Sequence, residues 1–380
     1  VPALFKFTSV IQSEFMVQVF RRGGRLVLSF FRKSGVQRGL LTRAAVCEDL
    51  EKGEVIVRDD WEIDENISSK KGMVHVETKC AGINFGEILQ LRGLYQEKLE
   101  PPFVPGNEIS GIVKKVGAGV TSVAAGDAVI ALPRGGGWAK DVILPESQVF
   151  ALGVPTNACD FASAAALSVA YGTANMALQH RAQIKSGETV VVTAAGGGVG
   201  LATVEVAKYL GARVVACASD QNKVEIALKK GAAAGLVYNT NNLQDKADHA
   251  KKFRADLKKL CPDGIDCVVD MLGDPCLNPL IRSLNFGGRA IIVGFASGHI
   301  PKIPANILLV KHVSVLGLYW GATLFNDPHL FNNNTQFVND AWRHAHFRPH
   351  VSQRFPLQDA NLAIQAILNR QTTGKVVLDL

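Results

Sequence analysis

The seven residues 194–200 have the types and the spacing needed to hold a dinucleotide. They read Ala-Ala-Gly-Gly-Gly-Val-Gly, and side chains this small let the backbone approach a pyrophosphate closely. The phosphate charge then faces free N–H groups at the start of a helix. A tight strand-to-helix turn without a ligand is the alternative interpretation. The residues expected to contact a cofactor are Ala194, Gly197, Gly198, Val199 and Gly200.

The segments on either side of this turn supply the elements that such a site requires. The β-branched run at residues 189–193 predicts a strand buried on both faces. An apolar stripe at helical spacing follows, ends at Gly211, and is succeeded by a second apolar run at residues 213–218. Strand, glycine turn, helix and second strand together form one βαβ unit.

The rest of the chain divides into two kinds of pattern. After the βαβ unit, apolar runs alternate with helical segments, which predicts an α/β fold with a doubly wound parallel Rossmann sheet. Residues 101–152 are instead dense in Gly and Pro with short apolar segments, as in a small irregular β-barrel. The six strands expected in the sheet are 189–193, 213–218, 236–238, 265–272, 289–295 and 313–319.

The spacing Ala194-x-x-Gly197-x-x-Gly200 after a valine strand resembles the motif of the zinc-independent medium-chain dehydrogenase/reductase family, the quinone oxidoreductases. The likeness covers everything after about Ala44. It implies a GroES-like β-barrel catalytic domain beside the Rossmann domain, with the active site in the cleft between them. The domains expected are a transit peptide or disordered leader at 1–43, the GroES-like catalytic domain at 44–165, the Rossmann NADP(H)-binding domain at 166–324, and a C-terminal return to the catalytic domain at 325–380.

The end of the second strand indicates which dinucleotide binds. An NAD site places a carboxylate there for the ribose hydroxyls, and that charge repels a 2′-phosphate. The aligned position here is the neutral Ala218, followed by Ser219 as a hydroxyl donor. By resemblance, Lys223 matches the lysine that holds the 2′-phosphate in quinone reductases. Asp220 lies close by and weakens the argument, and a solvated lysine on a helix is the alternative. NADPH is the cofactor expected.

The resemblance also implies residues around the nicotinamide and the adenosine. Asn84 matches an amide beside the nicotinamide, where it orients the ring carboxamide or a substrate carbonyl, so it is the expected catalytic residue as well as a cofactor contact. Thr173 resembles a nicotinamide contact, and Tyr238 resembles the residue that packs near the adenosine phosphate. Lys375 is expected to close over the cofactor from the C-terminal segment. Phe295, at the end of a predicted strand, completes the cofactor-binding set.

No metal is expected. In the zinc-dependent branch the first two ligands are Cys and His, and the matching positions here are Asn84 and Asn107, whose amides are poor zinc ligands. The group His344, His346 and His350 resembles a metal site superficially, but Pro349 argues against a continuous helix there.

The proton donor is left open. Many quinone and enoyl reductases carry a tyrosine five residues after the Asn, and here that position is Leu89. Either water supplies the proton, or another residue such as Tyr95 or Tyr171 does.

These features favour an NADPH-dependent reductase that transfers hydride to quinones or α,β-unsaturated carbonyls. Without a Lewis acid the acceptor must supply its own electrophilicity, and conjugation does so. The alternatives are an enoyl-thioester reductase and a non-catalytic NADPH-binding protein. A nucleic-acid partner is not expected, because the eight Lys and Arg of residues 1–43, set against Glu14 alone, account for the whole net charge of +7.

The basic leader fits a transit peptide to the mitochondrial matrix, with a cytoplasmic protein as the alternative. The seven scattered cysteines indicate reduced thiols and not a disulfide framework or a structural zinc site. No uncharged run reaches transmembrane length, so no membrane partner is expected. A homodimer is expected through an edge strand of the cofactor sheet, by family resemblance.

Overall fold

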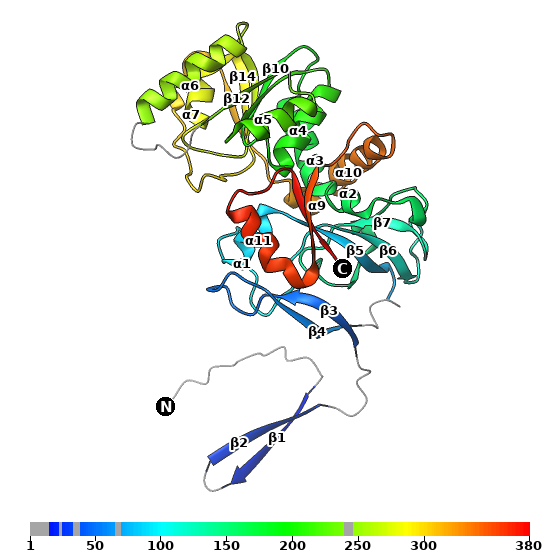
Figure 1. The fold of residues 1–380 in the computed structure, drawn as a ribbon. Coiled ribbons are helices and arrows are strands. Elements are labelled where there is room, and N and C mark those ends of the chain that lie inside the picture. Colours follow the sequence, from blue (N-terminus) through cyan, green and yellow to red (C-terminus); the bar gives the residue numbers. More distant parts are fainter. Residues whose placement is uncertain (1–14, 23–24, 33–38, 65–69, 239–245) are drawn as a thin grey trace.

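The computed structural model describes residues 15–22, 25–32, 39–64, 70–238 and 246–380. The predicted leader falls partly outside these ranges. Within it, β1 (Phe15–Arg22) and β2 (Arg25–Arg32) pair antiparallel as a two-stranded sheet of their own (Figure 1). The next strand, β3 (Leu40–Val46), begins before the expected boundary at residue 43, so the last residues of the predicted leader are part of a folded strand.

The cofactor domain is a six-stranded parallel sheet with the strand order β12-β11-β10-β13-β14-β15. The order runs outward in both directions from the strand that precedes the glycine turn, as in a doubly wound Rossmann sheet, so the predicted fold class is confirmed. The strands are β10 (Thr189–Val192), β11 (Arg213–Ala218), β12 (Ala234–Val237), β13 (Ile265–Asp270), β14 (Leu284–Ile292) and β15 (Ser314–Gly317). The helices are α4 (Gly198–Tyr209), α5 (Gln221–Lys229), α6 (Lys246–Leu260), α7 (Leu277–Ser283) and α8 (Ala305–Lys311).

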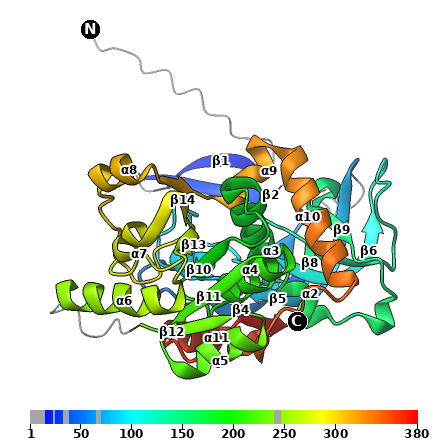
Figure 2. The ribbon, with the colours of Figure 1, turned by 90° about the horizontal axis from the view of Figure 1, so that it is seen from above.

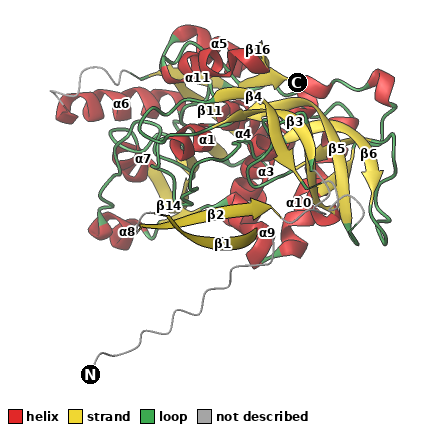
Figure 3. Ribbon diagram, turned by 90° about the horizontal axis from the view of Figure 1, so that it is seen from below, coloured by secondary structure: helices red, strands yellow, loops and turns green. Residues whose placement is uncertain are grey.

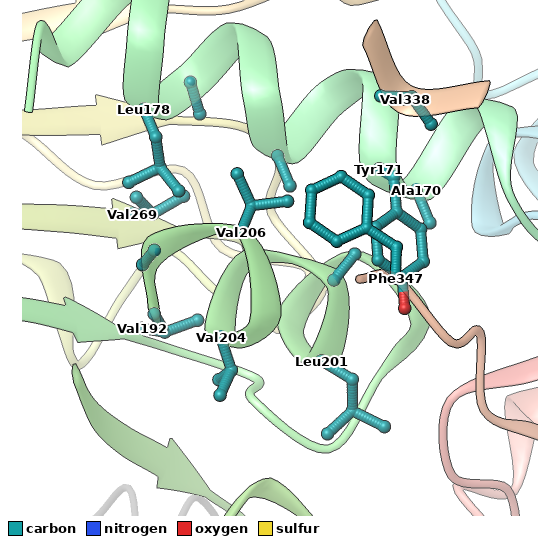
Figure 4. Packing of buried hydrophobic residues seen from close by; sticks show 14 of the residues in the cluster. Ala170, Tyr171, Leu178, Val192, Leu201, Val204, Val206, Val269, Val338 and Phe347 are labelled. Carbon is teal, nitrogen blue, oxygen red and sulfur yellow. The ribbon is translucent and has the colours of Figure 1, made fainter. Parts of the chain in front are cut away.

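One face of this sheet is sealed by α4 and by the helices that lead into the domain. Val192 of β10 and Val204 of α4 are fully buried, as the valine-rich strand predicts (Figure 4). Tyr171 and Phe347 stack against each other in the same cluster, with ring centroids 5.1 Å apart. Each fully buried Val or Leu side chain stabilises the fold by roughly 1.5–3 kcal/mol, so this cluster holds α4 firmly on the sheet.

The catalytic domain is built on a seven-stranded sheet in the order β16-β17-β5-β6-β7-β9, with β8 also paired to β5. β5 and β6 of this sheet lie side by side in Figure 3. The C-terminal strand β17 (Lys375–Asp379) pairs antiparallel with β5 (Met73–Ile83), so the chain returns to its first half. The remaining strands of this sheet are β6 (Ile109–Val116), β7 (Ala128–Ala131), β8 (Asp141–Pro145), β9 (Val149–Ala151) and β16 (Val351–Pro356). β4 (Ile56–Ile63) pairs with β3 in a separate two-stranded sheet. Two helices, α1 (Phe85–Leu91) and α11 (Ala360–Leu368), belong to this domain.

The two domains are joined by a row of short helices, α2 (Phe161–Ala165), α3 (Ser168–Asn175) and the π-helical segment η4 (Met176–Ala182). Two more helices, α9 (Thr323–Asn326) and α10 (Pro328–Arg343), follow β15. α10 lies across α3, where Asn334 accepts from the Asn175 amide at 2.7 Å and donates to Gly172 O at 3.1 Å. Seen from above, α10 lies at the opposite end of the molecule from α6 and α8 (Figure 2). Among the described helices, none combines the length and the apolar character needed to cross a bilayer.

Candidate active site

The glycine turn has the geometry that the motif predicts. Ala194 adopts a left-handed backbone with φ +47°, and Gly197 is the N-cap residue of α4 and donates to Ala194 O at 2.9 Å. A Cβ added at Gly200 would lie 2.2 Å from Ala194 O. Because that distance is far inside van der Waals contact, glycine is required at position 200 for the helix to start this close to the strand.

The start of α4 fits a pyrophosphate. The first N–H groups of a helix, here those of Gly198, Val199 and Gly200, have no intrahelical partner, and no side chain caps them. The C-terminal segment lies directly on this turn, because Gly374 N–H donates to Gly196 O at 2.8 Å and pairs with Gly197 in a β-bridge. A dinucleotide would therefore bind free donors at the junction between the two domains.

Ser219 and Lys223 come together at the carboxyl end of β11. The Lys223 ammonium lies 3.3 Å from Ser219 Oγ and 3.1 Å from Arg370 O. Asp220 is the N-cap residue of α5, where its carboxylate accepts from Lys223 N–H at 2.9 Å. Burial raises the pKa of Asp220, but the hydrogen bonds from Lys223 and Ser219 outweigh it and hold that pKa below its usual value. The carboxylate that complicates the sequence argument thus has a structural role as a helix cap.

Tyr238 is buried beside the same strand end. Its N–H donates to Ala218 O at 2.9 Å, and burial raises the pKa of its phenol well above the usual value. The positive charge of Arg370 acts on the pKa of Tyr238 in the opposite direction, and the Arg370 carbonyl accepts from Lys223. Sequence reasoning missed Arg370 because no motif surrounds it, and a loop residue with φ +58° carries no recognisable signal.

Asn84 and Lys375 meet, although 291 positions separate them. The Lys375 ammonium lies 2.6 Å from Asn84 Oδ1, 2.6 Å from Glu108 Oε1 and 3.0 Å from Ile83 O. The Asn84 amide in turn donates to Glu108 at 2.9 Å. The stem of Lys375 passes Gly198, where an added Cβ would meet Lys375 Cδ at 2.7 Å. The backbone before Lys375 therefore covers the glycine turn, whereas its charge is directed into the catalytic domain.

A second buried carboxylate fixes both amides that stand at the metal-ligand positions. Glu87 is fully buried, and it accepts from Asn84 N–H at 2.5 Å and from the Asn107 side chain at 2.9 Å. Burial raises the pKa of Glu87, and the charge of Lys375 opposes that shift. Asn84 is the N-cap residue of α1, and the contact of its backbone N–H with Glu87 is part of a capping box. The amides at positions 84 and 107 are thus engaged by carboxylates of the protein.

Thr173 and Phe295 lie further along the same junction. Thr173 is buried in α3, beside Gly172, where an added Cβ would touch the Trp320 ring at 2.7 Å. Phe295 follows the carboxyl end of β14 and lies against Gly273. Phe295 is thus at the carboxyl edge of the sheet, the edge at which β10 leads into the glycine turn.

Two tyrosines link the domains beside α1. Tyr95 lies against Gly86, and its ring meets Tyr319 edge to face with centroids 6.4 Å apart. The Tyr319 hydroxyl donates to Glu97 at 2.8 Å, and Glu97 also forms an ion pair with Arg134. Burial raises the pKa of Tyr95, and its hydrogen bond with Tyr319 opposes this rise. Sequence reasoning missed Tyr319, which follows a strand by two positions and has no distinguishing neighbour.

Tyr171, the other alternative for the proton donor, is wrongly placed for that role. Tyr171 is 2% exposed, and its hydroxyl donates to Glu205 of α4 inside the cofactor domain. Burial raises the pKa of Tyr171 well above its usual value. The surrounding helices bury Tyr171, and the sequence alone does not show how deeply a side chain is buried. Leu89 stands in α1, two residues after the buried Glu87.

The three histidines follow the end of α10 and do not converge. His344 contacts Asp340 O, the His346 ring packs against Tyr209 with the two ring planes inclined by 53°, and His350 bonds to the Thr373 hydroxyl at 3.0 Å. In the part of the chain that the structure describes, no group of three or more His, Cys, Asp or Glu side chains is placed to hold a metal ion.

Two family descriptions match the two halves of the chain. "Alcohol dehydrogenase GroES-like domain" matches residues 70–155 and "Zinc-binding dehydrogenase" matches residues 198–339. A quinone oxidoreductase-like protein 2 homolog from Nematostella vectensis is 39% identical over 341 residues, which are 89% of this chain and 88% of that protein. The chain belongs to the medium-chain dehydrogenase/reductase family. The resemblance in the glycine motif is thereby confirmed.

Other members of the medium-chain dehydrogenase/reductase family agree in sequence and in fold. Quinone oxidoreductase-like protein 2 of Bos taurus is 36% identical over 89% of this chain and 92% of its own length. The quinone oxidoreductase of Thermus thermophilus, solved alone and in complex with NADPH, has a TM-score of 0.71 at 30% identity and covers 89% of this chain and 100% of its own. The chain is therefore an oxidoreductase whose glycine turn suits a nicotinamide dinucleotide.

Proposed function

We propose that this chain transfers hydride from NADPH to quinones or α,β-unsaturated carbonyls, and that it does so without a metal. The observation that carries the proposal is the Lys375 ammonium 2.6 Å from both Asn84 and Glu108. Asn84 aligns with the first ligand of the zinc-dependent enzymes, and its amide oxygen already accepts from the buried ammonium of Lys375. Amides are also poor zinc ligands. The relatives named quinone oxidoreductases support the same acceptor class.

When bound, reduced nicotinamide supplies the hydride. The chain's own contribution is to hold the dinucleotide at the start of α4 and to fix the surfaces around the reacting ring. Asn84 is held by Glu87, Glu108 and Lys375, so its orientation is set before any ligand arrives. Such positioning, together with exclusion of water, lowers the barrier by several kcal/mol. Because the acceptor is conjugated, the charge that develops on it spreads without a Lewis acid.

The chain prefers NADPH to NADH because of the side chains at the carboxyl end of β11. The Lys223 ammonium lies 3.3 Å from Ser219 Oγ at the strand end. Asp220 caps α5 through Oδ1 and lies 3.3 Å from the same ammonium through Oδ2, so a 2′-phosphate would replace this carboxylate as the partner of Lys223. A 2′-phosphate would gain charge-assisted hydrogen bonds at this place. The complex of the Thermus relative with NADPH supports this choice.

Tyr95 is the side chain best placed to supply a proton to carbon. It lies against Gly86, two residues after Asn84, and its hydroxyl is 3.8 Å from the Cβ position of that glycine. Enones need such a proton, whereas the oxygens of a reduced quinone take protons from water.

The function is tested by following NADPH oxidation against a panel of ortho- and para-quinones, short enones, saturated ketones and alcohols, before and after chelator treatment. Turnover of the conjugated acceptors alone, unaffected by chelator, is expected. NADPH binding without consumption of any conjugated acceptor above the enzyme-free rate would contradict the proposal and favour a non-catalytic NADPH-binding protein.

A homodimer through β15 is part of the proposal. β15 is the edge strand of the cofactor sheet, and Leu309 and Val310 of the neighbouring α8 are 82% and 70% exposed. An exposed edge beside exposed apolar side chains suits pairing with a second copy. Analytical ultracentrifugation should give a dimer that Leu309→Glu shifts toward monomer, and a monomer at all concentrations would refute it.

The basic leader is proposed to direct the protein to the mitochondrial matrix. A fluorescent protein fused to residues 1–38 should enter mitochondria, and cytoplasmic fluorescence would argue for the alternative. The folded chain should tolerate removal of these residues, because β3 begins at Leu40. Removal of residues 1–43 should be less well tolerated, since it also deletes the Thr42 hydroxyl that donates to Asp141 at 3.0 Å.

A further inference from the structure

A pocket of about 650 Å³ lies between α6 and α7, outside the active site. The loop from Cys261 to Ile265 lines it and leads into β13, and Arg282 and Ser283 line it just before β14. The pocket is therefore at the amino ends of these strands, whereas the glycine turn follows the carboxyl end of β10. α6 and α7 lie together in the upper part of the cofactor domain, away from the catalytic domain (Figure 1).

The lining of this pocket combines apolar surface with positive charge. Leu257, Ile265 and Pro279 supply apolar atoms from α6, β13 and α7. Its charged lining residues are Lys251, Arg254, Lys258 and Arg282, and no Asp or Glu is among the described residues that line it. Positions 251, 254 and 258 are spaced by three and four residues, so they share one face of α6. Arg282 adds a positive charge from α7, so the charge of the pocket does not come from the face of α6 alone.

Among the residues whose side chains the structure describes, none forms an ion pair with the cations of the pocket. In the described part of the chain none of its four cationic side chains forms an ion pair, whereas Lys259, on the same helix but outside the pocket, pairs with Asp256 at 2.9 Å. Lys311 adds a fifth cation, because its ammonium donates to Arg282 O at 2.8 Å. Burial and the charge of Arg254 lower the pKa of Lys311, which reflects the positive potential around the pocket.

We propose that this pocket binds a small amphipathic anion, with an apolar chain between α6 and α7 and a carboxylate or phosphate head group held by Arg254 and Arg282. Guanidinium groups bind such oxyanions through two parallel hydrogen bonds. The volume lies within the range of about 300–1,000 Å³ found for small-molecule sites. An alkyl chain of about ten carbons would pack against the apolar lining residues. Its head group would then lie beside the cationic side chains of the pocket.

Isothermal titration calorimetry on the full chain saturated with NADPH tests this directly. The ligands are decanoate and decyl phosphate, each below its critical micelle concentration, and 1-decanol below its solubility limit. Both anions should bind at least tenfold more tightly than the alcohol, and the stronger of the two identifies the head group. Arg254→Glu and Arg282→Glu should each weaken anion binding at least tenfold. Lys259→Glu, the matched charge reversal outside the pocket, should leave it unchanged.

Three results would overturn the proposal. Equal binding of 1-decanol would mean that the cations contribute nothing, and an equal loss with Lys259→Glu would mean that overall charge attracts the ligand. Anion binding that occurs in a parallel titration without NADPH but is absent from the NADPH-saturated chain would place the ligand in the cofactor site instead. Unchanged melting temperature and NADPH affinity in the variants establish that any lost binding comes from the pocket.

Discussion

The ammonium group of Lys375 lies 2.6 Å from Oε1 of Glu108, and both side chains are almost fully buried, at 5% and 1% exposure. One residue earlier, Gly374 N–H donates to Gly196 O in the glycine turn. A single short segment thus connects the dinucleotide-binding turn to the polar centre of the catalytic domain. The proposed active site depends on this connection between the two domains.

Breaking the pair from one side should be costly. Lys375→Met leaves the Glu108 carboxylate buried without its cation, and we expect a loss of about 3–5 kcal/mol in the free energy of unfolding. The double variant Lys375→Met/Glu108→Gln removes both charges and should recover much of that loss. Urea denaturation of the three proteins measures both effects. A single variant as stable as the parent would show that the pair does not hold the domain together.

Lys223→Ala should weaken NADPH binding by about 1.5–3 kcal/mol, or roughly tenfold to a hundredfold, because a charge-assisted contact to the 2′-phosphate is lost. NADH binding should scarcely change. Fluorescence titration gives both dissociation constants. Lys229→Ala, in the last turn of the same helix, is the matched control and should affect neither. Equal losses for both cofactors in Lys223→Ala would refute the assignment.

Leu89→Tyr tests the supply of protons. A phenol at this position of α1 could donate a proton to carbon, so kcat with enones should rise more than kcat with quinones. Tyr95→Phe should have the converse effect and lower the enone rate selectively. Steady-state kinetics with one matched acceptor of each class measures the ratio. If both classes respond equally to both changes, neither phenol position controls proton delivery.

Much of the fold follows from the sequence because it depends on local patterns. The valines of β10, the glycine at the start of α4 and the alternation of strands and helices are all readable over short windows. The polar centre is different, because Asn84, Glu108 and Lys375 come from three segments that meet only after the C-terminal strand pairs with β5. Resemblance suggests the individual positions of Asn84 and Lys375, yet it does not show that the lysine bonds to the amide.

Burial and cross-domain contacts also escape sequence reasoning. Tyr171 and Tyr95 are equally plausible as proton donors from their position along the chain. The structure separates them, because the hydroxyl of Tyr171 is bonded to Glu205 in α4 and Tyr95 lies at the domain junction. Tyr319 and Arg370 similarly acquire significance only through their three-dimensional neighbours.

Asp270 should make stability depend on pH. Burial raises its pKa from 3.8 to about 6, against hydrogen bonds from Thr193 and two backbone N–H groups. Because the folded state holds this proton more tightly than the unfolded state, the free energy of unfolding should fall as pH rises from about 4 to about 6. The full change is about 2–3 kcal/mol at ~1.4 kcal/mol per pKa unit.

Asp270→Asn should remove this slope, so the variant should gain stability relative to the parent as pH rises through the same window. Thermal denaturation between pH 4 and pH 7 measures it. Asp263→Asn, at an exposed loop position, should leave the slope intact. Parallel pH profiles for the parent and Asp270→Asn would contradict the role given to Asp270.

Deuterium transfer tests the central claim most directly. The chelator-treated protein is incubated with a short enone and NADPH deuterated at C4, in separate experiments for the two faces of the ring. If the chain transfers hydride to conjugated acceptors without a metal, one of the two labels should appear at the β-carbon of the saturated product, with a primary isotope effect on turnover. An unlabelled product from both cofactors, or turnover that is lost with chelator and restored by zinc, would contradict the account.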